Sequence, residues 1–100
     1  MVWQRRGFGR WNDIGSWAEL WELSPRDADG NVAQGAGRVI TADSTGNMVF
    51  ADRRTVSLVG VDDLIVVETD DAIFVCPRDR AQDVKLIVQR LQAEGATELL

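Results

Sequence analysis

The chain has 100 residues, a hydrophobic fraction of 45% and a formal net charge of −5 at neutral pH. This composition is typical of one small globular domain and argues against a disordered chain. No apolar run approaches the roughly 20 residues that a membrane-spanning helix needs, and the first residues lack the apolar segment of a signal peptide. The acidic balance argues against non-specific binding to nucleic acid. We therefore expect a cytoplasmic protein with no membrane or nucleic-acid partner.

Two residue types narrow the possible chemistry. The sequence has no histidine, which removes the usual zinc ligand and the usual general base at neutral pH. The single cysteine, Cys76, lies in an apolar run and is expected to be a small buried hydrophobe.

The first ten residues carry Arg5, Arg6 and Arg10 without an acid. These arginines could contact a phosphate or simply be solvated, and both interpretations stay open.

The first 24 residues contain all four tryptophans and one helix signal. Ser16 and Glu19 have the spacing of a capping box, which predicts a short helix at about residues 17–23. Trp17 and Trp21 then lie on one face of this helix. Pro25 forces the preceding residue out of the helical region and ends the helix.

The middle of the chain reads as short strands separated by turn residues. The strands are expected at residues 38–42, 48–51, 55–59, 64–68 and 72–76. Their spacing of about eight to ten residues predicts a mostly β fold with flanking helices (α+β), either a meandering sheet or a short β-solenoid. Residues 64–67 and 73–75 are apolar at every position, so both strands are expected to be covered on both faces.

A helix is expected at about residues 79–94, with Asp79 as its N-cap and Gly95 just past its end. Its apolar residues recur at helical spacing, and they are Ala81, Val84, Ile87, Val88 and Leu91. We expect this stripe to pack against the sheet rather than bind a membrane.

Asp13 is the candidate metal ligand. A carboxylate just before a helix N-terminus is favoured by the helix dipole and suits a hard cation that faces bound phosphates. Gly15 allows the backbone to pass close to a ligand. The alternative is that Asp13 only forms a local turn and the tryptophans belong to the core.

Four segments carry a family resemblance, in order and in register over residues 11–93. They are Trp-Asn-Asp-Ile-Gly-Ser-Trp at 11–17, Asp-Gly-Asn-Val at 29–32, Gly-Val-Asp-Asp-Leu-Ile-Val-Val at 60–67, and Asp-Arg-Ala-Gln-Asp-Val-Lys at 79–85. They resemble the C-terminal part of mannose-1-phosphate guanylyltransferases, in the sugar-1-phosphate nucleotidyltransferase family. That family joins GTP and mannose 1-phosphate into GDP-mannose and pyrophosphate with the help of Mg²⁺.

The resemblance implies a fold and a site. It favours a short left-handed β-helix-like solenoid, with residues 1–24 as the end of the catalytic domain and residues 25–100 as a small β domain with a C-terminal helix. It places Asp13 at the second metal-binding aspartate of the family, and Gly15 and Ser16 at its substrate-binding segment.

Several parts of the family pattern have no counterpart in these 100 residues. The glycine-rich nucleotide loop, the first metal aspartate and the guanine- and sugar-binding strands are missing. We therefore expect a C-terminal fragment of a guanylyltransferase-like protein that is not catalytic and binds no Mg²⁺ alone. The alternative is an independent binding or oligomerisation module that uses the same fold.

The aromatic residues of the N-terminal stretch are the candidate interface. Phe8, Trp11, Trp17 and Trp21 would leave a large apolar patch in water if nothing covered them. We expect either a homodimer or contact with a separate catalytic half. Their burial within a single chain is the alternative.

Overall fold

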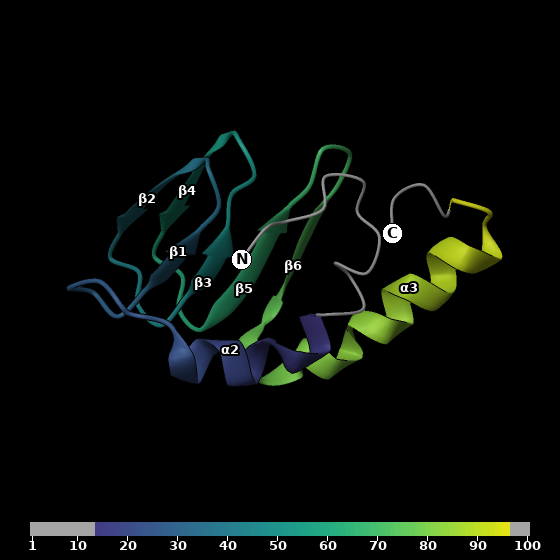
Figure 1. Cartoon of the computed structure of the whole chain (residues 1–100), viewed down its shortest axis with the longest axis horizontal. Helices are drawn as coiled ribbons and strands as arrows, with labels where there is room; N and C mark the ends of the chain where they lie inside the picture. The colour runs from purple at the N-terminus through teal and green to yellow at the C-terminus, as the bar shows by residue number, and fades with distance from the viewer. Residues whose placement is uncertain (1–13, 97–100) are drawn as a thin grey trace.

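The computed structural model describes residues 14–96, in which strands form two sheets and helices lie along one side of them (Figure 1). A four-stranded sheet has the order β1-β3-β5-β6, and a two-stranded sheet has the order β2-β4. The strands are β1 (Val32–Gln34), β2 (Arg38–Ala42), β3 (Met48–Phe50), β4 (Thr55–Val59), β5 (Leu64–Glu68) and β6 (Ile73–Pro77). The expected mostly β fold with flanking helices is confirmed.

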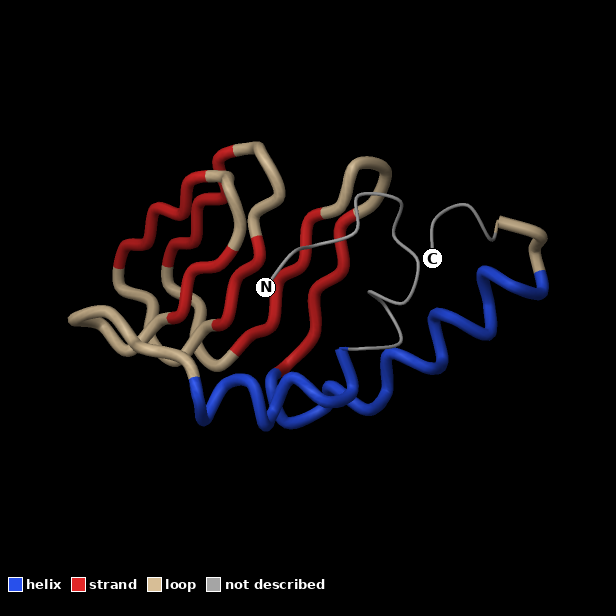
Figure 2. Tube along the Cα trace, viewed as in Figure 1, coloured by secondary structure: helices blue, strands red, loops and turns tan. Residues whose placement is uncertain are grey.

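The strands from β1 to β5 follow the path of a β-helix. The first two coils each contribute one strand to each sheet, the third contributes β5 to the four-stranded sheet, and successive coils pair in parallel. Val32 pairs with Met48 and Met48 with Ile65, so the coils advance by 16 and then 17 residues. Figure 2 shows the coils side by side, with loops turning between the two sheets. This parallel stacking decides between the meander and the solenoid in favour of the solenoid.

Two asparagines hold the coils in register at one corner. Asn47 is fully buried, and its side-chain amide donates to Asn31 Oδ1 (3.1 Å) and to the Val61 carbonyl (3.0 Å). Its Oδ1 accepts from the Leu64 backbone N–H (2.9 Å). Buried backbone groups need such partners where the chain leaves a strand. One side chain therefore joins three successive coils.

The hairpin from β5 to β6 ends the β-helix, because β6 pairs with β5 in antiparallel orientation. Ile65, Val66 and Val67 are buried, so β5 is covered on both faces as expected. The same expectation is wrong for β6, in which Ile73 is 66% exposed and Val75 54% exposed. The reason is that β6 is the last strand of its sheet, and the helices cover only the face that carries Phe74.

The first helical segment consists of a 3₁₀ turn, η1 (Ile14–Ser16), followed by α2 (Trp17–Leu23). The expected helix boundaries are confirmed, and Ser24 adopts an extended conformation before Pro25. Ser16 is the N-cap, but its side chain makes no capping hydrogen bond. The capping box is therefore wrong, because the preceding 3₁₀ turn gives Ser16 a backbone conformation different from that of a capping residue.

The C-terminal helical segment consists of a 3₁₀ stretch, η2 (Arg78–Asp83), and then α3 (Val84–Ala93). Asp79 lies inside η2 and makes no capping bond, so its assignment as N-cap is wrong. Arg80 and Asp83 form an ion pair of 2.7 Å at the i, i+3 spacing that brings side chains together in a 3₁₀ helix. Gly95 has a φ of +76° and closes α3 as expected.

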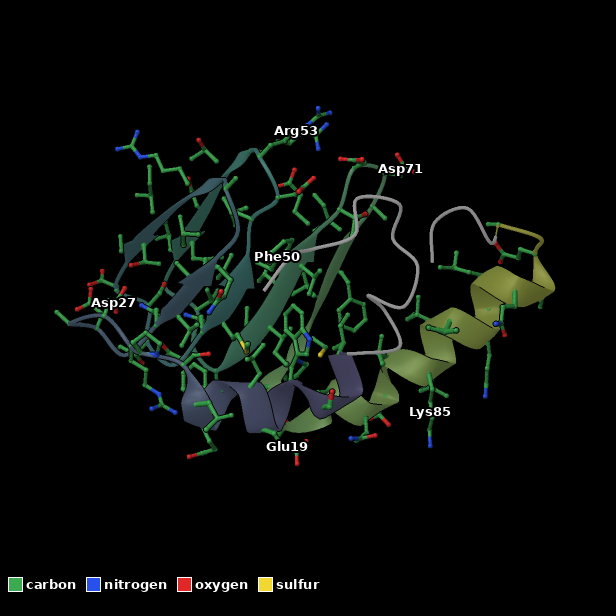
Figure 3. The ribbon with its side chains drawn as sticks, in the orientation of Figure 1. Glu19, Asp27, Phe50, Arg53, Asp71 and Lys85 are labelled. Carbon is green, nitrogen blue, oxygen red and sulfur yellow. The ribbon has the colours of Figure 1, made fainter. Side chains whose placement is uncertain are left out.

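Only half of the expected apolar stripe of α3 is covered. Val84 and Val88 are buried in the core, whereas Ile87 is 43% exposed. Figure 1 shows why, since α3 continues beyond β6 and leaves the sheet behind. In Figure 3, Glu19 and Lys85 extend from the outer side of the helices, away from the sheets. Among the described residues, no helix is long and apolar enough to span a membrane.

Candidate functional site

A cleft of about 460 Å³ opens between α2 and the turns that follow β4 and β6. Its floor is apolar and includes Trp21, Leu64 and Pro77. Its rim is charged and consists of Glu22, Asp62, Asp63, Arg78 and Asp79. The elements that build the cleft are far apart in sequence, and the helix α2 reaches the β-helix turns because its tryptophans belong to the same core.

Arg78 is the central residue of this cleft. Its guanidinium lies 4.1 Å from the centre of the Trp21 ring, within range of a cation–π interaction. Nε donates to the Gly46 carbonyl (2.8 Å), and Nη2 donates to Asp63 Oδ1 (3.0 Å). Arg78 thereby links the second coil, the third coil and α2.

A second arginine lies over the same indole. The guanidinium of Arg26 is 4.2 Å from the centre of the Trp21 ring, and its Nη2 donates to the Trp21 carbonyl (3.1 Å). Trp21 is only 7% exposed, so the two guanidinium groups seal the indole from water. Each of these cation–π contacts stabilises the packing of α2 at this corner of the fold.

Some of the charged groups that line the cleft already have partners within the chain. Four carboxylates and one guanidinium line it, and Asp63 is already paired with Arg78. Asp62 Oδ1 accepts from the backbone N–H of Thr45 (2.9 Å) and from its hydroxyl (3.1 Å). Within residues 14–96, no group of three or more His, Cys, Asp or Glu side chains is arranged to hold a metal ion.

The predicted substrate-binding residues lie away from this cleft's rim. Gly15 and Ser16 form the end of η1, and the Gln82 side chain of η2 donates to the Gly15 carbonyl. A side chain at position 15 would press against Gln82, so this glycine permits the contact between η1 and η2. The substrate role of Gly15 and Ser16 stays a prediction. The predicted metal ligand Asp13 and the predicted interface residues Phe8 and Trp11 lie outside the described residues.

Trp17 and Trp21 are 3% and 7% exposed, and both belong to the core of this one chain. Their burial removes the reason for placing these two residues in an interface, which was their expected exposure to water. The homodimer itself stays a prediction.

A second buried polar site lies at the far end of the coils. The Glu68 side chain is 1% exposed, and its Oε1 accepts from the backbone N–H groups of Asp52 (3.0 Å), Arg53 (3.4 Å) and Arg54 (3.2 Å). Its Oε2 pairs with Arg54 Nη1 at 2.9 Å. Burial raises the pKa of Glu68, but these hydrogen bonds outweigh it, so the pKa lies below its ordinary value. Glu68 thus holds the β3–β4 turn.

Sequence reasoning missed both Arg78 and Glu68. Glu68 had a signal, since it is a carboxylate at the end of an apolar strand run and is followed by further polar residues. The sequence carries no such signal for Arg78, because its contacts depend on where α2 crosses the coils.

Cys76 is a free cysteine that is half-buried rather than fully buried, and burial raises the pKa of its thiol.

Parallel coils that end in an antiparallel hairpin and a helix define a β-helix domain. The family model described as MannoseP isomerase/GMP-like beta-helix domain matches residues 37–91. The chain belongs to this family. The matched residues include β2 to β6 and most of α3, that is, the coils together with their closing helix.

Similar curated proteins include an alginate biosynthesis protein and a mannose-1-phosphate guanylyltransferase. The alginate biosynthesis protein AlgA of Pseudomonas aeruginosa is 43% identical over 88 residues, which are 88% of this chain and 18% of that protein. The mannose-1-phosphate guanylyltransferase of Escherichia coli is 43% identical with the same coverage of both chains. The chain therefore spans 18% of the length of these relatives.

A solved structure has the same fold. The crystal structure of mannose-1-phosphate geranyltransferase from Thermus thermophilus matches 80% of this chain and 24% of its own, with a TM-score of 0.71 and 38% sequence identity. The resemblance to the C-terminal part of mannose-1-phosphate guanylyltransferases is confirmed by these matches.

Proposed function

We propose that the chain acts as the C-terminal β-helix part of a mannose-1-phosphate guanylyltransferase-like protein that makes GDP-mannose, and that it is not catalytic alone. One observation carries the proposal: the chain matches a guanylyltransferase at 43% identity over 88 residues but spans 18% of its length. The proposal that the chain is not catalytic alone is supported by its sequence, because these 100 residues contain neither a glycine-rich nucleotide loop nor a counterpart of the first metal aspartate. A cytoplasmic location fits the free thiol of Cys76.

We propose that the chemistry that Mg²⁺ supplies in this family requires residues beyond those that the structure describes. Mg²⁺ is usually held by one or two carboxylates together with substrate phosphates. Of the four carboxylates that line the acidic cleft, Asp63 already pairs with Arg78 and Asp62 accepts from Thr45. We derive no catalytic step from these residues and propose that the metal is bound only with a catalytic half, through Asp13.

Titration calorimetry of the isolated chain tests this function. The chain is titrated with GDP-mannose, with GTP and with Mg²⁺ separately and together, and we expect no saturable heat at millimolar ligand. Saturable binding of GTP with Mg²⁺ that is lost in Asp13→Ala would show that the chain carries its own nucleotide site. Asp62→Ala is the matched control, because it removes a carboxylate from the cleft but leaves Asp13.

The second candidate is an independent binding or oligomerisation module. The specific observation in its favour is the exposed apolar strand β6 at the edge of the sheet. Co-purification of a second polypeptide or a second copy distinguishes this candidate from a chain that functions only when joined to a catalytic domain.

A further inference from the structure

The fold brings together the first and the last of the four segments that carry the family resemblance. The 3₁₀ turn η1 belongs to the segment at 11–17, and η2 contains most of the segment at 79–85. The two turns contact each other, and Figure 1 shows the purple start of the described chain beside the green start of the C-terminal helical segment. The segment at 79–85 supplies only Asp79 to the acidic cleft. Its other residues therefore have a role elsewhere, at η1.

Two buried side chains anchor η1 and the start of α2 from the inside. Ile14 is completely buried and Trp17 is 3% exposed. Both belong to the same core as Ala81 of η2. The predicted substrate-binding residues Gly15 and Ser16 lie between these anchors, with Gly15 half-buried and Ser16 exposed. The core thus holds the chain on both sides of this pair and leaves the pair itself at the surface.

The side chain of Gln82 holds the same pair from the outside. Its Nε2 donates a hydrogen bond to the Gly15 carbonyl, across a separation of 67 residues in the chain. A Cβ at position 15 would lie 3.2 Å from Gln82 Oε1, closer than ordinary van der Waals contact, so a glycine gives Gln82 the room that it needs. Gln82 is exposed. Its bond to Gly15 can therefore be removed without disturbing the packing of the core.

We propose that Gln82 is a positioning residue for the predicted substrate-binding pair Gly15 and Ser16. This inference rests on the proposed function, because the pair would act only together with a catalytic half. Glycine has the most freedom of rotation about its backbone bonds, so the peptide group between Gly15 and Ser16 needs a fixed partner. Gln82 supplies that partner through the carbonyl of this peptide group, which also carries the Ser16 N–H. The β-helix part thereby orients a segment at the boundary with the catalytic half.

Backbone order parameters of the 100-residue chain, measured by NMR relaxation, test this role directly. The Ser16 N–H is the reporter, because it shares a peptide group with the Gly15 carbonyl. We expect a value near the ~0.85 of a rigid backbone in the native chain and a fall towards ~0.6 in Gln82→Ala. Gln89→Ala is the matched control, since it removes an exposed glutamine of α3. An unchanged Ser16 value in Gln82→Ala would overturn the proposal.

Two further variants separate the hydrogen bond from the bulk of the side chain. Gln82→Glu keeps the shape of the side chain but has no N–H donor at neutral pH, so its Ser16 order parameter should fall as it does in Gln82→Ala. Gln82→Lys keeps a donor on a flexible stem and should restore the native value. The order parameters of β5 should stay unchanged in every variant, which verifies the fold. A Gln82→Glu chain as ordered at Ser16 as the native chain would contradict the role of this hydrogen bond.

Activity provides a second measurement in a joined protein. In a chimera, this chain replaces the 88 matched residues of the Escherichia coli mannose-1-phosphate guanylyltransferase. Gln82→Ala and Gln82→Glu should lower kcat about tenfold, because small displacements of a substrate-positioning group have effects of this size, and Gln82→Lys should restore it. The KM for GTP should stay within about twofold, since Gln82 itself touches no substrate.

The two measurements distinguish the inference from the proposed function. An active chimera whose kcat is the same with and without Gln82→Ala would overturn the positioning role and leave the proposed function standing. A folded chimera without activity would contradict the proposed function, and the Ser16 order parameters would then decide on Gln82 by themselves.

Discussion

The carboxylate of Glu68 lies 2.9 Å from Arg54 Nη1, and it is almost completely buried while Arg54 is half exposed. The same carboxylate accepts three backbone N–H groups of the turn between β3 and β4. The Glu68 carboxylate therefore takes the place of backbone carbonyl groups as the hydrogen-bond acceptor for this turn. The second and third coils are joined here by a side chain rather than by strand pairing.

Removing this carboxylate should destabilise the fold. Glu68→Ala leaves the N–H groups of the turn without their acceptor, and we expect a loss of roughly 2–3 kcal/mol in the free energy of unfolding. Urea denaturation measures it. The control is Glu94→Ala, which removes an exposed partner of Arg90 and should change stability by no more than about 0.5 kcal/mol. Equal effects would contradict the structural role of Glu68.

The pH dependence of stability should report on the same residue. Because the folded-state pKa of Glu68 is lowered below its ordinary value of 4.5, the unfolded chain binds a proton more readily. The contribution of Glu68 is fully present above about pH 4.5 and is lost as the pH falls through the lower folded-state pKa. Urea midpoints measured from pH 7 to pH 3 should fall less steeply in Glu68→Gln than in the native chain. An unchanged slope in Glu68→Gln would assign acid sensitivity to other groups.

Two glycines with similar backbone angles should respond differently to alanine. Gly46 and Gly60 have φ values of +70° and +65°. A Cβ at Gly60 meets nothing, so Gly60→Ala should cost about 1 kcal/mol of backbone strain. A Cβ at Gly46 overlaps Asp63, so Gly46→Ala should cost at least ~1 kcal/mol more by displacing the Asp63–Arg78 pair. Thermal unfolding compares the two, and equal losses would contradict the close approach at Gly46.

The asparagine ladder should be intolerant of isosteric change. Asn47→Asp keeps the size of the side chain but removes the donor to Asn31 and Val61. We expect a loss of about 2–4 kcal/mol, because a buried carboxylate would then face two carbonyl-type oxygens. Thr45→Ala, at an exposed position one turn away, is the control and should stay within ~1 kcal/mol. A stable Asn47→Asp at neutral pH would show that the ladder does not hold the coils.

The sequence predicted local structure better than long-range contacts. Helix α2 and strands β2, β4 and β5 begin and end where turn residues and Pro25 indicated. Strand β1 was missed, because its three residues are too short to show a period. The repeat of Gly-Asn at residues 30–31 and 46–47 was a signal for the coil length that strand spacing alone did not give.

Edges and clefts could not be predicted from these patterns. An apolar run such as Ile73–Val75 looks the same whether its strand is central or last in the sheet, and only the topology decides. The Trp21–Arg78 contact joins residues far apart in the chain and has no local pattern. The placement of Asp13, by contrast, rests on the family resemblance and stays a prediction.

The most direct test of the proposed function is pyrophosphate release by a chimera. The 88 matched residues of the Escherichia coli mannose-1-phosphate guanylyltransferase are replaced with the corresponding residues of this chain. If the chain is the β-helix part of such a protein, the chimera should release pyrophosphate from GTP and mannose 1-phosphate at a rate within about tenfold of its parent, a difference of ~1.4 kcal/mol in activation free energy. A folded chimera that releases none, while its parent remains active, would contradict the account.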